Sequence, residues 1–369
     1  MKPIYATVIL CALAATLQAE AQMTRRFTAG KDNEYGLVYT LPQTAFDVTL
    51  AADKRVETPG EFRLYSKKYL HIDPILEPSV RWTLSGAEVT PVAVPDADER
   101  WRVQFRNGST PFMTLTDAGF PLAVNDGEYF PETATAPTLK AVAATPTILE
   151  TSAAREAVTE EMLRSNSTAK RAELAAARIY EIRQTRADIL SGQADAMPSD
   201  GAAMQLVLDN LARQEAALTA MFTGTVSIST EIATFTVTPP PADAAGRSVV
   251  ARLSVLDGIV DADDLSGAPV YIDFSDVVTA ELPVNEKGVT KTFPKDGLAY
   301  RIPGQATVTV SYDGRTLASL EMTEVAQYGV VFGLDPGMFT DKKAPSYLLF
   351  NPLTGGVREL GVIQNETSR

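Results

Sequence analysis

The spacing of apolar residues changes abruptly within this chain, and that change limits the available folds more than any other feature. From about residue 167 to 222, apolar side chains recur every three to four residues, which is the period of an α-helix. Before residue 145 and after residue 224 they mostly alternate with polar residues, which is the period of a β-strand. The sequence therefore predicts an α+β fold with two mainly antiparallel β-rich modules joined by a helical segment.

The helical segment carries two apolar stripes separated by a chain break. Ser167 is the predicted N-cap of the first helix, and Gly192 is its predicted C′ residue. The sequence Met197–Asp200 contains a proline, interrupts the pattern and starts the second helix. The loop between the two stripes has about eight residues, and a loop of this length predicts an antiparallel helical hairpin within residues 148–222. Its first part, 148–166, is ambiguous between helix and extended chain.

The strand-rich segments on either side of the hairpin are divided by turn sequences. Residues 22–147 are predicted to form an N-terminal β-rich domain, with one short helix after Pro59-Gly60 and a Thr-, Ala- and Pro-rich linker at 132–147. Residues 223–363 are predicted to form a C-terminal β-sandwich-like domain, followed by a tail at 364–369.

Two features of the C-terminal segment predict local geometry. Asp313-Gly314 lies between alternating runs and has the composition of a tight hairpin turn. Within the strand that follows Gly224, the apolar residues change phase between Ile232 and Phe235. Such a slip predicts a bulge or a bend in one long strand.

The first 21 residues have the pattern of a secretory signal peptide. Lys2 precedes an apolar stretch from Ile4 to Leu17, and Ala19-Glu20-Ala21 forms a small-x-small cleavage site. That stretch is too short to span a bilayer, and no later apolar run is long enough, so no transmembrane segment is expected. The sequence predicts a protein exported through a cleaved signal peptide, either periplasmic or associated with the outer membrane.

The usual catalytic side chains are scarce. The single cysteine, Cys11, lies inside the signal peptide, and Leu10 before it is not the small residue that a lipoprotein site needs. The mature chain therefore has no disulfide, thiol nucleophile or cysteine zinc site. His71 is the single histidine, and the chain has no Gly-x-Ser-x-Gly sequence. We interpret His71 as a structural residue at a helix end and expect no cofactor.

Acidic residues outnumber basic ones, 46 to 33, which gives a net charge of −13 and argues against nucleic-acid binding. Weak calcium candidates are Asp257, Asp261, Asp263 and Asp264, because alternate carboxylates before a glycine are found in calcium loops. Their order does not fit an EF-hand, so an acidic surface loop is the favoured interpretation. A smaller acidic cluster is formed by Asp96, Asp98 and Glu99. The ring set Phe62, Tyr65 and Tyr69 is interpreted as core rather than as a ligand stack.

Short sequence landmarks along the chain add a family resemblance. They are Pro42-x-Thr44, Pro59-Gly60-x-Phe62, Val94-Pro95-Asp96, Thr116-Asp117-x-Gly119, Arg183-x-x-Arg186, Tyr300-Arg301-x-Pro303-Gly304, Gln327-Tyr328-Gly329 and Asn351-Pro352-x-Thr354-Gly355. In order and spacing the chain resembles the domain of unknown function 4831 family, exported proteins of Bacteroidota, over about residues 36–360. The resemblance implies a Gram-negative envelope setting and carries no catalytic residues.

Three classes of function remain open. The favoured hypothesis is a non-enzymatic envelope protein that binds a protein partner or contributes to an assembly, with the hairpin as a contact element. The alternative is a carbohydrate- or calcium-dependent binding module. The second alternative is a hydrolase that uses carboxylates alone, since such a pair need not be close in sequence.

Overall fold

The computed structural model describes residues 37–103, 112–131, 137–194, 201–295, 297–339 and 345–363. The predicted signal peptide with Cys11 and the predicted tail at 364–369 lie outside the described residues. In chain order, with 3₁₀ helices marked η, the elements are β1 (Leu37–Thr58), η1 (Arg63–Tyr65), α2 (Ser66–Leu70), β2 (Ser79–Val103), β3 (Met113–Leu115), β4 (Pro121–Val124), η2 (Ile148–Glu150), α3 (Ser152–Ala157), α4 (Glu160–Arg164), α5 (Thr168–Ser191), α6 (Gly201–Thr223), β5 (Thr225–Val237), η3 (Ala242–Ala244), β6 (Arg247–Ser254), β7 (Gly258–Asp261), β8 (Gly267–Val278), β9 (Leu298–Tyr312), β10 (Arg315–Leu334), η4 (Pro336–Phe339), β11 (Ser346–Phe350) and β12 (Val357–Val362).

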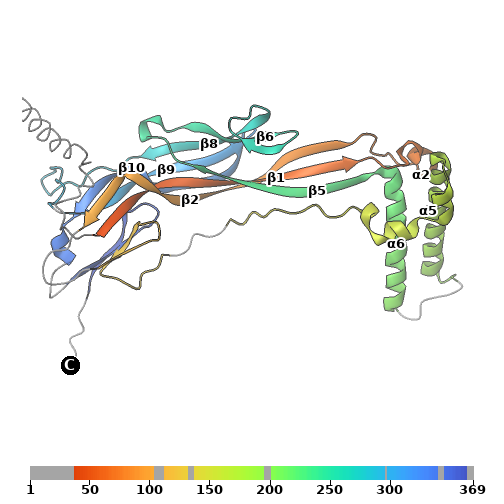
Figure 1. The fold of residues 1–369 in the computed structure, drawn as a ribbon, viewed down its shortest axis with the longest axis horizontal. Helices are drawn as coiled ribbons and strands as arrows, with labels where there is room; N and C mark the ends of the chain where they lie inside the picture. Colours follow the sequence, from red (N-terminus) through yellow and green to blue (C-terminus); the bar gives the residue numbers. More distant parts are fainter. Residues whose placement is uncertain are drawn as a thin grey trace, which may run out of the picture.

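A three-stranded antiparallel ribbon runs along the molecule, with helices at one end and the other sheets towards the opposite end (Figure 1). β1 is the central strand, and β2 and β5 pair with it on either side. β1 has 22 residues, so at about 3.3 Å per residue it spans on the order of 70 Å. The ribbon therefore sets the distance between the helical end and the β-rich end.

The β-rich end is built by packing a second sheet on the ribbon. The second sheet has the order β10-β9-β8-β6-β7 and is antiparallel throughout. Phe46, Val48 and Leu50 alternate along β1 and are fully buried in one cluster with residues of this sheet, among them Phe274. The rings of Phe46 and Phe274 lie 5.7 Å apart. Two antiparallel sheets facing each other confirm the predicted α+β class and its sandwich-like part.

A third, four-stranded sheet has the order β12-β11-β4-β3 and joins strands from both sides of the hairpin in sequence. Leu348 on β11, for example, pairs with Val124 on β4. The ribbon shows the same mixing, because β5 follows the hairpin and pairs with β1. The hairpin thus separates two β-rich parts in sequence, while strands from both parts share sheets in space.

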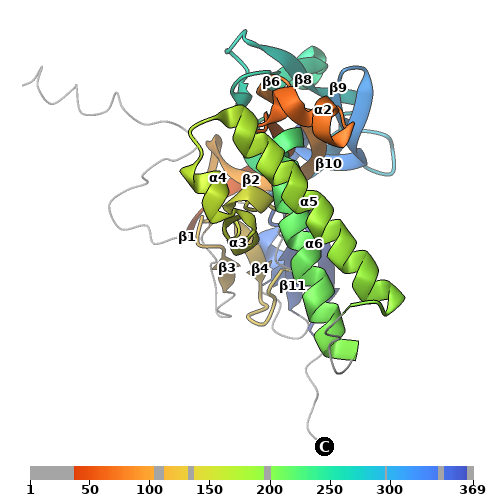
Figure 2. The ribbon, with the colours of Figure 1, turned by 90° about the vertical axis from the view of Figure 1, so that its right-hand side faces the viewer.

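The helical hairpin consists of α5 and α6, which stand side by side and project from the ribbon (Figures 1 and 2). The predicted caps of α5 are confirmed. The side chain of Ser167 accepts a hydrogen bond from the Lys170 backbone N–H, and Gly192 ends the helix with a φ of 71°. Where the hairpin meets the ribbon, Ile179, Leu218 and other side chains are fully buried in a cluster that also contains Phe62.

The segment between the linker and the hairpin, ambiguous in sequence, forms η2 and the short helices α3 and α4. Of the predicted linker, residues 137–147 run along the ribbon (Figure 1). The Thr138 backbone N–H donates to the Glu88 carboxylate on β2 at 2.8 Å. Val142 exchanges two backbone hydrogen bonds with Thr230 on β5, at 2.9 and 2.8 Å. These contacts fix the linker against both outer strands of the ribbon.

Two local predictions about turns and strands had different outcomes. The hairpin turn is confirmed, because Asp313 and Gly314 both have positive φ and connect β9 to β10. For β5 the sequence left a bulge or a bend open; the bulge is wrong, since β5 pairs with β1 without a register shift, and the bend stays a prediction. The apolar phase changes because the packing changes along the strand. Phe235 packs into the sandwich core, whereas Ile228, nearer the hairpin, is 50% exposed.

Candidate functional site

The candidate residues named from the sequence lie in different parts of the molecule. His71 is exposed and ends α2 in the left-handed conformation, with a φ of 56°, so its predicted place at a helix end is confirmed. Phe62 is buried beside Phe222, with ring centroids 5.3 Å apart. Tyr65 and Tyr69 pack against the same cluster. These rings belong to the core of the helical end.

Of the four aspartates proposed as weak calcium candidates, Asp261 is the last residue of β7, and the other three lie just before or just after that strand. The Asp257 carboxylate is hydrogen-bonded by the Ser254 hydroxyl at 3.2 Å. The backbone N–H of Ser266 hydrogen-bonds Asp264 and, with its side chain, lowers the pKa of that carboxyl. In the described part of the chain, no three His, Cys, Asp or Glu side chains gather so that they could hold a metal ion. Asp261 and Asp263 therefore join no such group.

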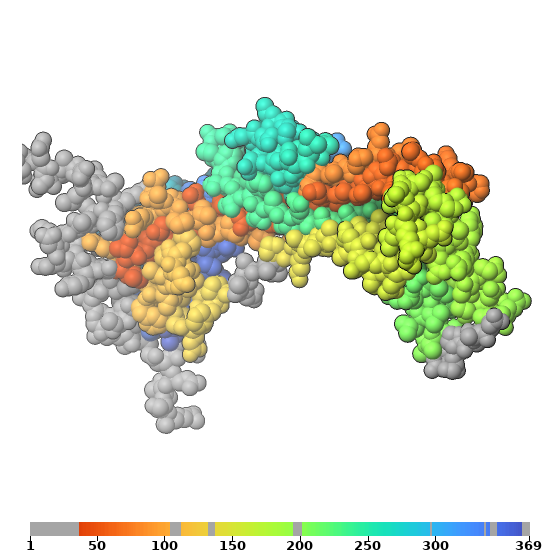
Figure 3. Space-filling view, turned by 45° about the vertical axis from the view of Figure 1, so that its right-hand side comes forward, coloured from red at the N-terminus to blue at the C-terminus, as the bar shows by residue number. Residues whose placement is uncertain are grey.

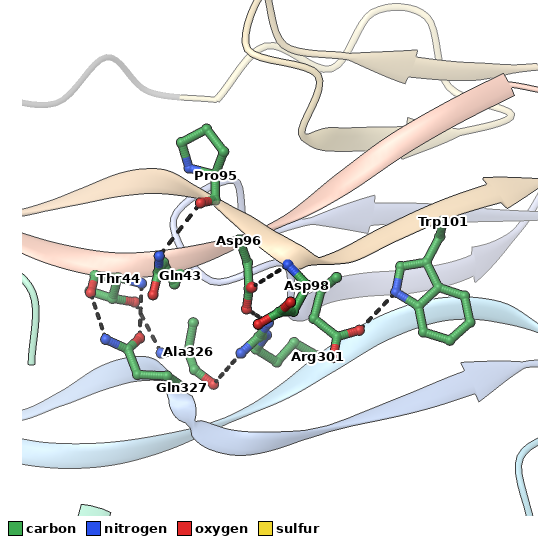
Figure 4. A network of polar contacts seen from close by, with 10 residues as sticks. Gln43, Thr44, Pro95, Asp96, Asp98, Trp101, Arg301, Ala326 and Gln327 are labelled. Atoms are coloured by element: carbon green, nitrogen blue, oxygen red, sulfur yellow. Dashed lines mark hydrogen bonds and ion pairs between the residues drawn. The ribbon is translucent and has the colours of Figure 1, made fainter. Parts of the chain in front are cut away.

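Polar side chains from distant segments meet at one place inside the β-rich end, which we call the polar junction (Figure 4). It comprises Thr44 on β1, Asp96 on β2, Arg301 on β9 and Gln327 on β10. Arg301 and Asp96 form an ion pair at 2.8 Å, with side-chain exposures of 6% and 20%. Asp96 was recognised in sequence as part of an acidic cluster, but its cationic partner was not.

Arg301 also hydrogen-bonds two further segments. Its guanidinium donates to the Ala326 carbonyl oxygen on β10 at 3.2 Å. Its backbone N–H donates to the Gly355 carbonyl oxygen in the loop between β11 and β12 at 2.9 Å. Its Nε is buried and has no hydrogen-bond partner among the described residues. A guanidinium carries five N–H donors and no acceptor, so this side chain binds and orients its neighbours.

Thr44 and Gln327 form the second half of the polar junction. The Thr44 backbone N–H donates to the Gln327 side-chain oxygen at 3.0 Å, and the Gln327 side-chain nitrogen donates to the Thr44 carbonyl oxygen at 2.8 Å. The Thr44 hydroxyl accepts from the Ala326 backbone N–H at 3.0 Å. Thr44 is fully buried, so these bonds satisfy groups that would otherwise be costly to bury. The polar junction thus acts as a brace, by which we mean that its hydrogen bonds and ion pair hold the ribbon against the second sheet.

Several sequence landmarks converge at this brace. Thr44, Asp96, Arg301 and Gln327 each come from a different landmark, and Gly355 comes from a fifth. The sequence signal for this site is Arg301, a charged residue between Tyr300 and Ile302 in an otherwise apolar run. A charge at such a position is buried only when it is paired.

The outer part of the hairpin differs from the polar junction in burial, because its large apolar side chains are exposed. We define the hairpin tip as residues 183–194, which are the end of α5 and the three residues after it, together with residues 201–214 of α6. All buried residues of α6 lie in its last seven positions, from Ala217 to Phe222. In the hairpin tip, Leu190 is 67% and Leu206 66% exposed. Figure 3 shows the hairpin protruding from the body of the molecule.

Ion pairs connect the two helices of the hairpin. The Glu215 carboxylate accepts from Arg183 at 2.7 Å and also pairs with Arg186. Among the described residues, no helix is both long and apolar enough to cross a membrane. The exposed leucines of the hairpin tip belong to a helix pair whose two helices are joined by these ion pairs.

Comparison with known proteins places almost the whole chain in one family. A family model described as "Domain of unknown function (DUF4831)" matches residues 35–358. No curated protein and no solved structure matches the chain.

Proposed function

The chain belongs to the DUF4831 family, and we propose that it is a non-enzymatic envelope protein that binds a protein partner through the hairpin tip. The observation that carries the proposal is the distribution of burial in α6, where every buried residue lies in the last seven positions. The preceding 16 residues would span about 24 Å of helix. An isolated helix pair of this size buries little apolar surface, so a partner supplies the missing cover.

The proposal includes the setting of the protein. The predicted signal peptide with its Ala19-Glu20-Ala21 cleavage site supports export, and the family resemblance supports the envelope of Bacteroidota, in the periplasm or at the outer membrane. A net charge of −13 favours a protein partner over a nucleic acid. The length of the ribbon supports a role in which the hairpin tip reaches a partner at a distance from the β-rich end.

Site-specific photo-crosslinking in intact cells tests the proposal. A photoreactive residue at Leu206 or Leu190 is expected to give a discrete crosslinked product in the envelope fraction. The control position is Asp243, which is exposed at the β-rich end. Equal crosslinking from Asp243, or none from the two leucine positions, would contradict the proposal. Mass spectrometry of the product then identifies the partner.

A further inference from the structure

The loop between β8 and β9 leaves a cavity at the end of the molecule opposite the hairpin. Its residues 279–295 lie over the ends of β9 and β10, and the cavity between them has a volume of about 630 Å³. Cavities that hold small ligands have volumes of roughly 300–1,000 Å³. The walls include Asn285, Thr290, Lys291, Thr292, Tyr300 and Phe332.

The wall formed by the loop is held in place by its own hydrogen bonds. Val284 and Thr290 form an isolated antiparallel bridge, and the Lys291 backbone N–H donates to the Pro283 carbonyl oxygen at 2.8 Å. The Asn285 side-chain oxygen accepts the backbone N–H groups of Lys287 and Val289 at 2.9 and 3.0 Å. The loop therefore keeps its shape without a ligand.

Aromatic packing attaches this loop to the sheet. The ring of Phe293 stacks on Trp101 of β2, with centroids 5.5 Å apart and planes at 8°. It also meets Phe332 of β10 edge-on at 6.1 Å. Gly333 makes this contact possible, because a Cβ there would lie 2.8 Å from the Phe293 ring. The cavity is thus preformed, which lowers the entropic cost of binding.

The chemistry of the lining is amphipathic. Tyr300, which is half-buried, supplies aromatic surface, and the buried Phe332 packs edge-on behind it with ring centroids 6.5 Å apart. Thr290 and Thr292 also line the cavity and are exposed, and the hydroxyls of these threonines and of Tyr300 can donate and accept hydrogen bonds. Lys291 and Asp335 bring one charge of each sign to the same cavity, so the cavity selects for neither anions nor cations.

We propose that this cavity binds a neutral saccharide. A sugar ring presents a face of C–H groups that packs on an aromatic ring, and a rim of hydroxyls that both donate and accept hydrogen bonds. The cavity offers the complement of both, the Tyr300 ring together with the hydroxyls of Thr290 and Thr292. This site is separate from the hairpin tip and does not depend on the function proposed there.

Saturation-transfer difference NMR of the full chain tests the proposal with defined probes. These are cellotriose, maltotriose and triacetylchitotriose, with the capped peptide acetyl-Ala-Ala-Ala-amide as a probe of another class. At least one trisaccharide is expected to show transfer to its ring protons. Absence of transfer for all three trisaccharides, or transfer to the peptide alone, would overturn the proposal.

Matched variants locate the site. Tyr300→Phe and Thr292→Val remove one hydroxyl each and keep the shape of the side chain, and they are expected to weaken binding at least fivefold. Lys287→Ala changes an exposed position in the same loop outside the cavity and is the control. Thermal melting confirms that all three variants fold. Unchanged affinity in both hydroxyl variants would show that any saccharide binds elsewhere.

Discussion

In the polar junction, contacts join residues that are far apart in the chain, whereas in the hairpin they join neighbouring helices. Arg301 and Asp96 are 205 positions apart, and Thr44 and Gln327 are 283 apart. In the hairpin, Arg183 and Glu215 are separated by only 32 positions. Breaking a contact at the polar junction therefore loosens several sheets together. The hairpin tip can open by itself, at a free energy below that of global unfolding.

The largest expected decrease in the free energy of unfolding is at the polar junction. Arg301→Met leaves the Asp96 carboxylate, which is only 20% exposed, without its cation, and loss of one partner of a buried pair costs about 3–5 kcal/mol. Urea denaturation should show this decrease in the free energy of unfolding. Arg315→Met, at an exposed position on β10, is the matched control and should change stability by less than about 0.5 kcal/mol. A loss below about 1 kcal/mol for Arg301→Met would mean that the pair is not a brace.

The next largest loss of stability is expected at the base of the hairpin, the part that packs on the ribbon, and it should exceed the loss in the hairpin tip. Leu218 is fully buried at the base, so Leu218→Ala should cost about 2–5 kcal/mol through lost transfer energy and a residual cavity. Leu211 packs only partly against the same cluster, and Leu211→Ala should cost about 1 kcal/mol. Denaturation curves of the two variants provide the comparison. Equal losses would show that the hairpin is buried evenly along its length.

Ionisation of Tyr39 in the β-rich end should lower the free energy of unfolding by an intermediate amount. Burial raises the pKa of Tyr39 well above its usual value, and its hydroxyl donates to the Ala299 carbonyl oxygen at 2.9 Å. Above about pH 10 the unfolded chain ionises this tyrosine while the folded chain keeps it protonated, so stability falls as pH rises. The loss reaches about 1.4 kcal/mol by pH 11.

Tyr39→Phe removes that titration. The stability difference between wild type and Tyr39→Phe, measured by urea denaturation at pH 8, reports only the lost hydrogen bond. Between pH 8 and pH 11 the wild type should lose about 1.4 kcal/mol more than the variant. Parallel pH curves for the two proteins would argue against a protonated, buried Tyr39.

The smallest expected change in stability lies in the hairpin tip. Leu206→Ala and Arg213→Ala both alter exposed positions on α6, and each should change the free energy of unfolding by less than about 0.5 kcal/mol. Thermal melting checks this. A loss above about 1 kcal/mol for Leu206→Ala would mean that its side chain is covered within the chain itself, which would remove the basis for a docking role.

The sequence predicted the elements whose determinants are local. Ser167 and Gly192 set the ends of α5 by hydrogen bonds within one turn of the helix, and Asp313-Gly314 defines a hairpin through its own backbone angles. The pairing of β5 with β1 was not predictable in this way, because alternation shows that a strand exists and not which strand it joins. The polar junction was missed for the same reason, since nothing near Arg301 in sequence indicates Asp96 as its partner.

The sheet β12-β11-β4-β3 has a consequence for the order in which the protein acquires its structure. β3 and β4 are synthesised more than 200 residues before β11. Until β11 arrives, Tyr39, Leu41 and Val124 lack the core partners Leu348 and Phe350. A nascent chain must therefore keep this apolar surface from aggregating while the rest is made.

The hairpin needs no such delay, because its two helices and caps are consecutive and form on a much faster timescale. The core of the β-rich end is therefore completed only once β11 is available, later than that of the hairpin.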